Sequence, residues 1–174
     1  EIIHNIKENG YLILNADDHF YNFHKKLALK RKISILSFSV KNKSSNIYLN
    51  SIKKQKLKYR VSIAINNKNR YFYFNTCFEN DIKNLLASIA IVSIYKNINK
   101  LDYNFFYNHK IPSGRGDVSK VKLFKKNFYL IDQSYNSNPL SLNSALKNFN
   151  MIKLNDAKKH LILGDMLELG KYSH

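Results

Sequence analysis

The sequence has one cysteine, no tryptophan, two prolines and five glycines among 174 residues. A single cysteine, Cys77, excludes an internal disulfide and fits a reducing cytoplasm, where it would serve as a small apolar filler. No stretch reaches the roughly 18 consecutive apolar residues that a membrane-spanning helix needs. The longest candidate, "LLASIAIVSIY" (85–95), therefore predicts a buried helix. The order of residues in "EIIHNIKENG" also leads us to expect no signal peptide.

Acidic residues are scarce: 12 Asp and Glu stand against 29 Lys and Arg, for a formal net charge of +17. Such a charge is typical of nucleic-acid or anionic-membrane surfaces. However, the abundant Lys, Asn, Ile and Tyr share A/T-rich codons, and arginine, the best fork for bases and phosphates, is rare. The basic residues are scattered, with "KKQKLK" (53–58) the only dense run. The pattern favours a solvated basic surface, and a basic nucleic-acid-binding module is the alternative.

The apolar periodicity predicts an α/β fold. Residues 10–16 and 33–40 read as buried strands, and residues 17–32 between them as a helix. Asp17 or Asp18 is suited to cap this helix, with Phe20, Phe23 and Leu27 on its inner face. Residues 10–40 thus predict a βαβ unit with parallel strands.

Alternating segments follow at 46–52 and 59–75, and the "NNKN" (66–69) inside the second predicts an antiparallel hairpin. Helices are expected over 82–95 and 101–108. The segment "IPSGRGD" (111–117) gathers proline and glycine, so it is the best linker candidate.

A second βαβ pattern follows this linker. Strands are predicted over 126–134 and 159–165, with a helix between them that Asn138 caps and Pro139 begins. Its expected inner face is Leu142, Ala145, Leu146 and Phe149. Ligands collect beyond the carboxyl ends of parallel strands, where residues 132–138 and Gly164–Asp165 fall. Spacing alone leaves open whether Asn136 and Asn138 bind a ligand or only make turns and caps.

Two long motifs, "LIDQSYNSNPLSLNSAL" (130–146) and "LILGDMLELGKYS" (161–173), closely resemble those of the Mur ligases of bacterial cell-wall synthesis. Within that family they are most similar to the members that add D-alanyl-D-alanine. The resemblance extends back through "SGRG" (113–116), "NLLASIAI" (84–91) and "GYLILNADD" (10–18) to the first residues, where Asn5 replaces a family glycine.

The resemblance implies an α/β fold in two parts. Residues 1–111 would be the C-terminal part of the family's central ATPase domain, a mixed sheet with helices. Residues 112–174 would begin its Rossmann-like C-terminal domain with a first βαβ unit. The implied activity is ATP-dependent amide-bond formation. ATP phosphorylates the carboxylate of a UDP-N-acetylmuramoyl-tripeptide, the D-alanyl-D-alanine amine attacks the acyl phosphate, and magnesium bridges the phosphates. The resemblance further implies a cytoplasmic enzyme, monomeric at full length, without nucleic-acid or membrane partners.

The resemblance also implies roles for individual residues. Asn84 matches an asparagine near the adenine, and Arg115 a linker arginine that reaches the ATP phosphates. Asp132 matches a carboxylate near the ribose, with Asn136 and Asn138 in the same loop. The implied substrate-side residues are Ser134, Tyr135 and Asp165. Alternatively, Asn84 caps or cross-links helices and Arg115 is a solvated loop charge.

Several features depart from the family pattern. Asn80 and Asp81 replace a His-Asn pair, and Gln133 replaces a second acidic residue beside Asp132. The six histidines show no metal-ligand spacing, so no metal-ligating residue is assigned. No GxxxxGK(S/T) phosphate loop occurs. We therefore expect the chain to be a piece of a longer protein that is inactive alone.

Overall fold

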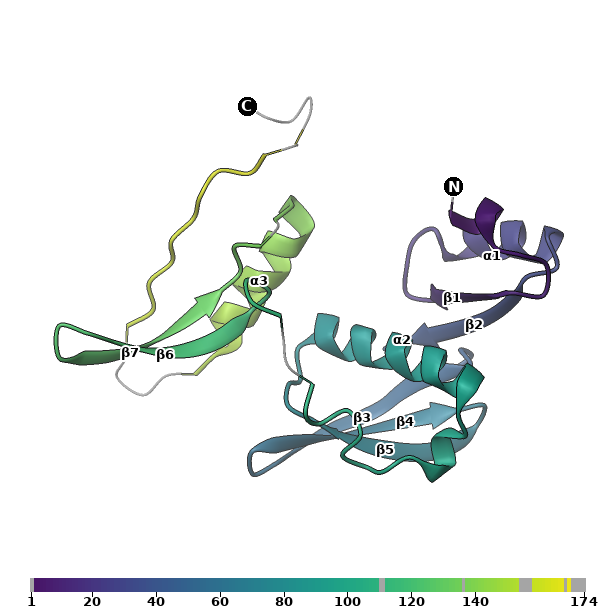
Figure 1. The fold of residues 1–174 in the computed structure, drawn as a ribbon, viewed down its shortest axis with the longest axis horizontal. Helices are drawn as coiled ribbons and strands as arrows, with labels where there is room; N and C mark the ends of the chain where they lie inside the picture. The colour runs from purple at the N-terminus through teal and green to yellow at the C-terminus, as the bar shows by residue number, and fades with distance from the viewer. Residues whose placement is uncertain (1, 110–111, 136, 154–157, 168, 170–174) are drawn as a thin grey trace. The chain divides into compact units, whose positions relative to one another are not determined.

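The computed structural model describes residues 2–109, 112–135, 137–153, 158–167 and 169. The chain divides into two compact units, Glu1–His109 and Lys110–His174 (Figure 1). In chain order, the first unit contains η1 (Ile2–Asn5), β1 (Tyr11–Asn15), α1 (Tyr21–Lys30), β2 (Ser34–Ser39), β3 (Ile47–Gln55), β4 (Lys58–Ile65), β5 (Lys68–Phe74), α2 (Glu79–Tyr95) and η2 (Ile98–Lys100).

The first unit is built on one five-stranded mixed sheet with the order β1-β2-β3-β4-β5. Strands β1, β2 and β3 pair in parallel, whereas β4 pairs antiparallel with both β3 and β5. The predicted parallel pair over 10–40 and the hairpin over 59–75 are therefore confirmed. Asn66 and Asn67 both have positive φ, 46° and 66°, as a two-residue hairpin turn requires, and asparagine tolerates this region better than most residues.

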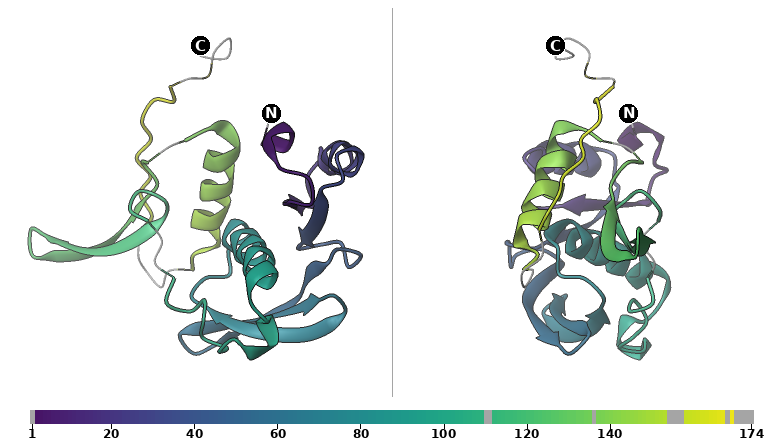
Figure 2. Two further views of the ribbon diagram at one scale, coloured as in Figure 1. Left: turned by 45° about the vertical axis from the view of Figure 1, so that its right-hand side comes forward. Right: turned by 90° about the vertical axis from the view of Figure 1, so that its left-hand side faces the viewer.

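Helix α2 covers one face of this sheet, as both views of Figure 2 show. Its buried residues recur at helical spacing and are Ile82, Leu85, Leu86, Ile89 and Ala90. They pack in one cluster with alternate residues of the strands, among them Val61, Ile63, Phe72 and Phe74. Because a strand's successive side chains point to opposite faces, this alternation gives the sheet one apolar face. The predicted helix over 82–95 is confirmed, with a start three residues earlier.

Helix α1 belongs to the second face of the sheet. Leu12 and Ile35 pack in a small cluster with Leu27 and Ala28, whereas the neighbouring Ile13 packs in the α2 cluster. The helix therefore presents Leu27 and Ala28 to the sheet. Of these two residues, the sequence predicted Leu27.

The prediction for the start of α1 is wrong. Phe20 and Phe23, expected on the inner face, are 59% and 64% exposed, and the helix begins at Tyr21 after an N-cap at Phe20. Asp18 accepts the N–H of Phe20 in a local turn (2.8 Å). Asp17 accepts the N–H of Val40 (2.7 Å) and the hydroxyl of Ser39, at the end of β2. Neither aspartate caps the helix, because Asp17 binds groups at the end of β2 and Asp18 binds the N–H of a local turn.

The helix expected over 101–108 is also wrong, since turns occupy this segment. The Tyr73 N–H donates to the Tyr103 carbonyl (2.7 Å), which attaches the segment to the edge strand β5. The Tyr71 and Tyr103 rings stack 4.3 Å apart, and Phe106 lies edge-on to Phe72 at 5.1 Å. These tertiary aromatic contacts override the local helical pattern.

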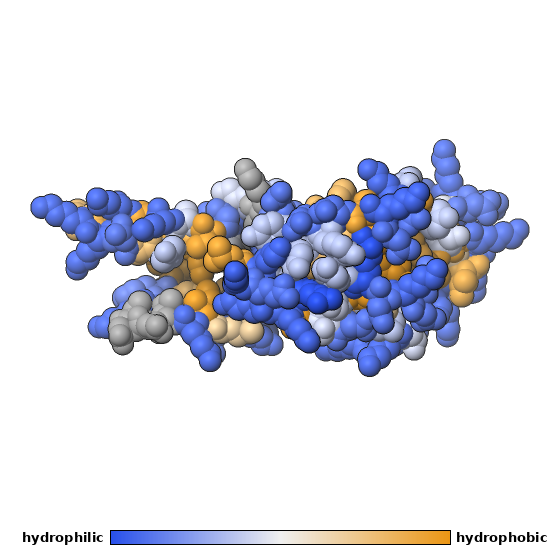
Figure 3. All heavy atoms as spheres, turned by 90° about the horizontal axis from the view of Figure 1, so that it is seen from below, coloured by the Kyte–Doolittle hydropathy of each residue, from blue (hydrophilic) through white to orange (hydrophobic). Residues whose placement is uncertain are grey.

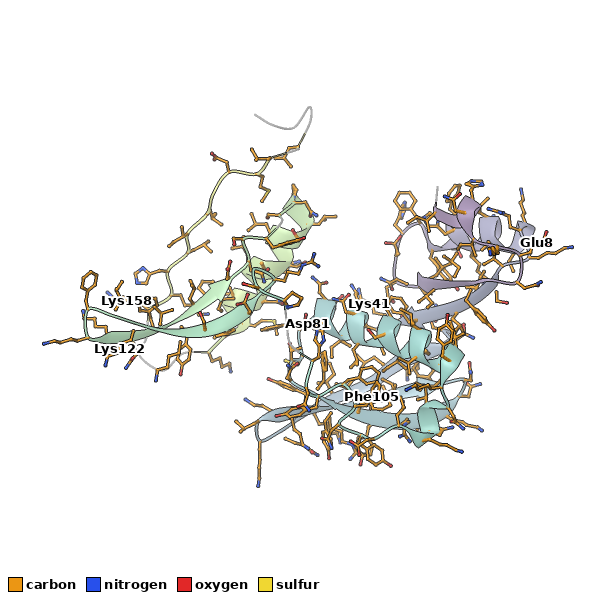
Figure 4. The ribbon with its side chains drawn as sticks, viewed as in Figure 1. Glu8, Lys41, Asp81, Phe105, Lys122 and Lys158 are labelled. Atoms are coloured by element: carbon orange, nitrogen blue, oxygen red, sulfur yellow. The ribbon has the colours of Figure 1, made fainter. Side chains whose placement is uncertain are left out.

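The second unit contains β6 (Asp117–Leu123), β7 (Lys126–Asp132) and α3 (Pro139–Met151). Strands β6 and β7 form an antiparallel hairpin, and Lys122 extends from β6 (Figure 4). The sequence missed β6, because its lysines break the two-residue alternation and its turn at Phe124 and Lys125 has positive φ without glycine or asparagine. Helix α3 matches its prediction: Leu142, Ala145, Leu146 and Phe149 are all half-buried, although none is fully buried.

The predicted strand over 159–165 is wrong, because the described residues 158–167 form no strand. The second unit therefore lacks the predicted βαβ arrangement in its described part. A parallel pair is stable when both faces of the sheet are covered. Here Phe128 and Leu130 of β7 are 42% and 46% exposed, and Ile162 is 93% exposed. Apolar side chains are visible between hydrophilic ones in Figure 3.

Candidate functional site

Two segments far apart in the sequence meet in the second unit. One is the turn over residues 113–116, and the other is the corner over residues 132–135 that follows β7. The Gly116 N–H donates to the Asp132 carbonyl (2.6 Å), and the Tyr135 N–H donates to the Gly114 carbonyl (3.1 Å). These two bonds join the 113–116 turn to both ends of the 132–135 corner.

Two glycines make this close approach possible. Gly114 and Gly116 have φ values of 76° and 96°, in the region that glycine occupies without strain. A Cβ atom on Gly114 would lie 2.9 Å from the Tyr135 Cβ and 3.0 Å from its nitrogen. A Cβ atom on Gly116 would lie 2.7 Å from the Gln133 Nε2. The turn therefore needs glycine for its conformation as well as for space.

Arg115 lies between these glycines with an exposed side chain. Its Cζ atom stands 4.5 Å from the centroid of the Tyr135 ring, in a cation–π contact. Its backbone N–H donates to the Pro112 carbonyl (3.2 Å), so the backbone of the turn is held as well. The structure thus brings Arg115 together with the predicted residues of the 132–135 corner.

Asp132 ends β7, and its carboxylate is arranged by Ser134. The Ser134 N–H donates to the Asp132 Oδ1 atom (2.9 Å). The Ser134 hydroxyl, and then this N–H, hold the pKa of the Asp132 carboxyl below its ordinary value of 3.8. Asp132 is therefore ionised at neutral pH, and a carboxylate in this state accepts hydrogen bonds from hydroxyl groups.

Asn138 is the N-cap of α3, as predicted. Its side chain accepts the Ser141 N–H and the Ser141 hydroxyl accepts the Asn138 N–H, both at 2.9 Å, which forms a capping box before Pro139. The side-chain oxygen of Asn138 therefore has a structural partner. Asn136, predicted in the same loop, lies outside the residues that the structure describes.

Asn84 belongs to the first unit and lies exposed on α2, on the face away from the buried Ile82, Leu85 and Leu86. Of the two residues before it that differ from the family pattern, Asp81 makes a contact within its own segment. Asp81 lies in the first turn of α2 (Figure 4) and accepts the Thr76 hydroxyl (2.8 Å). This contact fixes the chain where it enters the helix.

Asp165 is exposed within the unpaired segment 158–167, so the structure does not join it to the 132–135 corner through neighbouring strands. One contributor that the sequence reasoning missed is Asp117. Its Oδ1 atom accepts the Gly114 N–H (2.7 Å), which closes the 113–116 turn. The available signal was an aspartate directly after a Gly-rich turn, since a carboxylate accepts backbone N–H groups.

The described residues contain no group of three or more His, Cys, Asp and Glu side chains arranged to hold a metal ion. Over the same residues, every helix is too short or too polar to cross a bilayer.

The sequence matches a family model, the Mur ligase middle domain, over residues 1–92. The chain belongs to the Mur ligase family. The resemblance inferred from the two long motifs is therefore confirmed. The five-stranded mixed sheet with its helices is the Mur ligase fold of this region.

Two curated Mur ligases are similar to most of the chain, and both are named UDP-N-acetylmuramoyl-tripeptide–D-alanyl-D-alanine ligase. The enzyme of Buchnera aphidicola subsp. Baizongia pistaciae (strain Bp) is 30% identical over 171 residues, which cover 98% of this chain and 35% of the relative. The enzyme of Buchnera aphidicola subsp. Acyrthosiphon pisum (strain APS) is 30% identical over 182 residues, which cover 99% of this chain and 36% of the relative. The chain thus spans about a third of the length of these relatives.

Solved Mur ligase structures share the fold. A crystal structure of MurF from Acinetobacter baumannii aligns with a TM-score of 0.74 at 18% identity, over 99% of this chain and 35% of that chain. MurF from Thermotoga maritima in complex with ADP aligns with a TM-score of 0.73 at 19% identity. The alignment covers 96% of this chain and 36% of that chain.

Proposed function

We propose that this chain is part of an ATP-dependent ligase that joins D-alanyl-D-alanine to UDP-N-acetylmuramoyl-tripeptide through an acyl phosphate. The names of the two curated relatives support the substrates, since both are 30% identical to nearly the whole chain. The motif "LIDQSYNSNP" and the turn "SGRG" support the same conclusion because they come together in space, although 13 residues (117–129) separate them in the sequence.

One observation carries the proposal: the guanidinium of Arg115 and the ionised carboxylate of Asp132 belong to one hydrogen-bonded pair of loops. A guanidinium binds phosphate oxygens in a fork, and a carboxylate accepts hydrogen bonds from sugar hydroxyls. A nucleotide carries both phosphate oxygens and sugar hydroxyls, so a joined pair of loops that bears both groups fits this ligand class. The ADP complex of the Thermotoga maritima structure is consistent with this ligand class.

The other residues take supporting roles in the proposal. Arg115 would bind ATP phosphates, Asp132 the ribose, and Asn84 the adenine, with Asn136 and Asn138 in the nucleotide loop. Ser134, Tyr135 and Asp165 would lie on the substrate side. Bound ATP would supply the phosphoryl group that activates the tripeptide carboxylate, while this chain's residues bind and orient it.

The proposal also covers the domains, the location and the metal requirement of the enzyme. Residues 1–111 would belong to the central ATP-binding domain and residues 112–174 to the C-terminal domain of a cytoplasmic, monomeric enzyme. Magnesium would bind together with ATP, and the described residues contain no group of three or more His, Cys, Asp and Glu side chains that could hold a metal ion. We place no metal ligand on this chain.

The test is a phosphate-release assay on the chain extended to the length of its relatives. With ATP and magnesium present, we expect release only when both UDP-N-acetylmuramoyl-tripeptide and D-alanyl-D-alanine are added. The matched controls omit one substrate at a time. Turnover that ignores the substrates would contradict the proposal. Tight, sequence-selective DNA binding at physiological salt would instead favour the nucleic-acid-binding alternative that the charge of +17 raises.

A further inference from the structure

We infer that Tyr135 is a positioning residue for Arg115: its ring is the platform that holds the guanidinium ready for a nucleotide phosphate. The inference rests on the proposed function, in which Arg115 binds phosphate. It assigns Tyr135 a role through its ring, distinct from any contact of its hydroxyl with the substrate.

The contact joins two exposed side chains. The Arg115 Cζ atom is 4.5 Å from the ring centroid, and Tyr135 is 66% exposed. An exposed arginine ordinarily samples many rotamers, because its long side chain has nothing to hold it. A ring beneath the guanidinium narrows this sampling by the attraction between the cation and the negative ring face.

Backbone hydrogen bonds hold the two residues next to each other. Both glycines that flank Arg115 are tied to the 132–135 corner: Gly114 by its carbonyl, which accepts the Tyr135 N–H, and Gly116 by its N–H, which donates to Asp132. The position of the Tyr135 backbone relative to Arg115 is therefore fixed. A side chain at position 114 would push Tyr135 away, since its Cβ atom would lie 2.9 Å from the Tyr135 Cβ.

The centre of the turn offers no free backbone N–H group to an anion. Its three successive N–H groups already have acceptors: Asp117 Oδ1 for Gly114, the Pro112 carbonyl for Arg115 and the Asp132 carbonyl for Gly116. These three N–H groups are therefore not free for a phosphate, and the Arg115 side chain is the cation that the turn presents to it. Its orientation then decides the strength of the interaction.

A neutral ring is also the right kind of platform. Among the described residues, the single ion pair is that of Lys83 with Glu79, so Arg115 has no carboxylate partner there. A carboxylate would hold the guanidinium equally well but would neutralise it. Tyr135 restrains the side chain and leaves its charge for a phosphate.

The first experiment measures the contact in this chain by nuclear magnetic resonance. The sequence has four arginines, Arg31, Arg60, Arg70 and Arg115, so few side-chain Nε–Hε signals need assignment. Arg115→Ala identifies the signal. We expect it shifted by the Tyr135 ring current in the wild-type chain and in Tyr135→Phe, and returned to the position of free arginine in Tyr135→Leu.

Tyr129→Leu is the matched control, since Tyr129 is 71% exposed on β7 and stands opposite Lys120, away from the 132–135 corner. It should leave the Arg115 signal unchanged. The wild-type spectrum needs no variant to fold: an unshifted Arg115 signal, without cross-relaxation to the Tyr135 ring protons, would overturn the inference directly.

The second experiment measures ATP kinetics in the extended ligase. Loss of an exposed cation–π contact corresponds to about a two- to fivefold change in affinity, so Tyr135→Leu should raise the KM for ATP by that factor. Tyr135→Phe should keep the wild-type KM for ATP, because it retains the ring. A Tyr135→Phe defect as large as that of Tyr135→Leu would assign the hydroxyl the role and overturn the platform.

The two experiments separate the two proposals. A shifted Arg115 signal together with an Arg115→Ala enzyme of normal KM for ATP would contradict the phosphate role of Arg115 and leave the contact standing. An unshifted signal with a weakened Arg115→Ala enzyme would contradict the platform and support the phosphate role.

Discussion

At the scale of single residues, several polar side chains in the second unit have partners within the chain. Asn138 caps α3, Asp117 closes the 113–116 turn, and Ser134 orients Asp132. Arg115 is different, because its partner is a neutral ring and its charge stays available. This difference is why we place phosphate binding on Arg115 and not on the backbone of the turn.

The pair Glu79–Lys83 gives a prediction with a definite dependence on pH. Its atoms are 2.7 Å apart at i,i+4 spacing in the first turns of α2, and the Lys83 ammonium holds the pKa of Glu79 below its ordinary value of 4.5. Because the folded pKa is the lower one, the stabilisation is present above the unfolded pKa and is lost as the pH falls through the folded value.

We therefore expect Glu79→Gln to lower the free energy of unfolding by about 0.3–0.5 kcal/mol at pH 7, the usual size for such helical pairs. The difference between variant and wild type should vanish in acid below the folded pKa. Urea titrations at both pH values measure it. A difference that persists in acid would show that the charge of Glu79 is not what stabilises the helix.

At the scale of elements, one helix and one sheet face account for the first unit. Leu86 and Ile89 of α2 are fully buried against the strands, as are Val61, Ile63 and Phe72. The opposite face of the sheet carries Arg60 and Tyr71, whose contact is 3.9 Å. The stability of the unit is thus concentrated in the layer between α2 and the sheet.

Substitutions on the two faces of α2 should separate this effect from helix propensity. Leu86→Ala is expected to cost about 2–5 kcal/mol of unfolding free energy, through lost burial and the cavity left behind. Ile91→Ala is the matched control, since Ile91 is 49% exposed on the other face, and it should change the unfolding free energy by about 0.5 kcal/mol or less. Chemical denaturation of both variants checks the difference. Equal losses would contradict the assignment of the buried face.

At the scale of the whole molecule, the chain spans about a third of its curated relatives and contains no GxxxxGK(S/T) loop. Phosphoryl transfer depends on positioning and on stabilising charge at the phosphates, which such a loop and its lysine provide. We therefore expect the chain of 174 residues to release no phosphate from ATP with both substrates present. Substrate-dependent release above a heat-killed control would show that catalytic groups lie within this chain.

Exposed apolar side chains bear on the behaviour of the second unit. Phe124, Ile162 and Leu167 are 87%, 93% and 81% exposed, and no residue of α3 is fully buried. Apolar surface of this kind favours association unless other protein covers it. In the proposed full-length ligase, further parts of the enzyme would provide that cover.

Elements with strong local signals could be predicted from the sequence. The period of α2, the "NNKN" turn and the Asn138–Pro139 start of α3 are encoded within a few neighbouring residues, so backbone preference and capping chemistry suffice. The family could be recognised for a similar reason, since its motifs are contiguous. The turns over 101–108 and the exposure of Phe20 and Phe23 at the start of α1 could not be predicted, because contacts with distant residues outweigh local preference there.

The candidate site shows the same division. From the sequence alone, Arg115 was a candidate on one segment, with a solvated loop charge as its alternative, and Asp132 and Tyr135 were candidates on another. Tertiary structure decided that the 113–116 turn and the 132–135 corner form one hydrogen-bonded unit and that Arg115 rests on Tyr135. The physical reason is that the approach depends on two glycines with positive φ and on the hairpin that pairs Asp117 with Asp132, and this hairpin forms through cross-strand bonds that no local pattern announced.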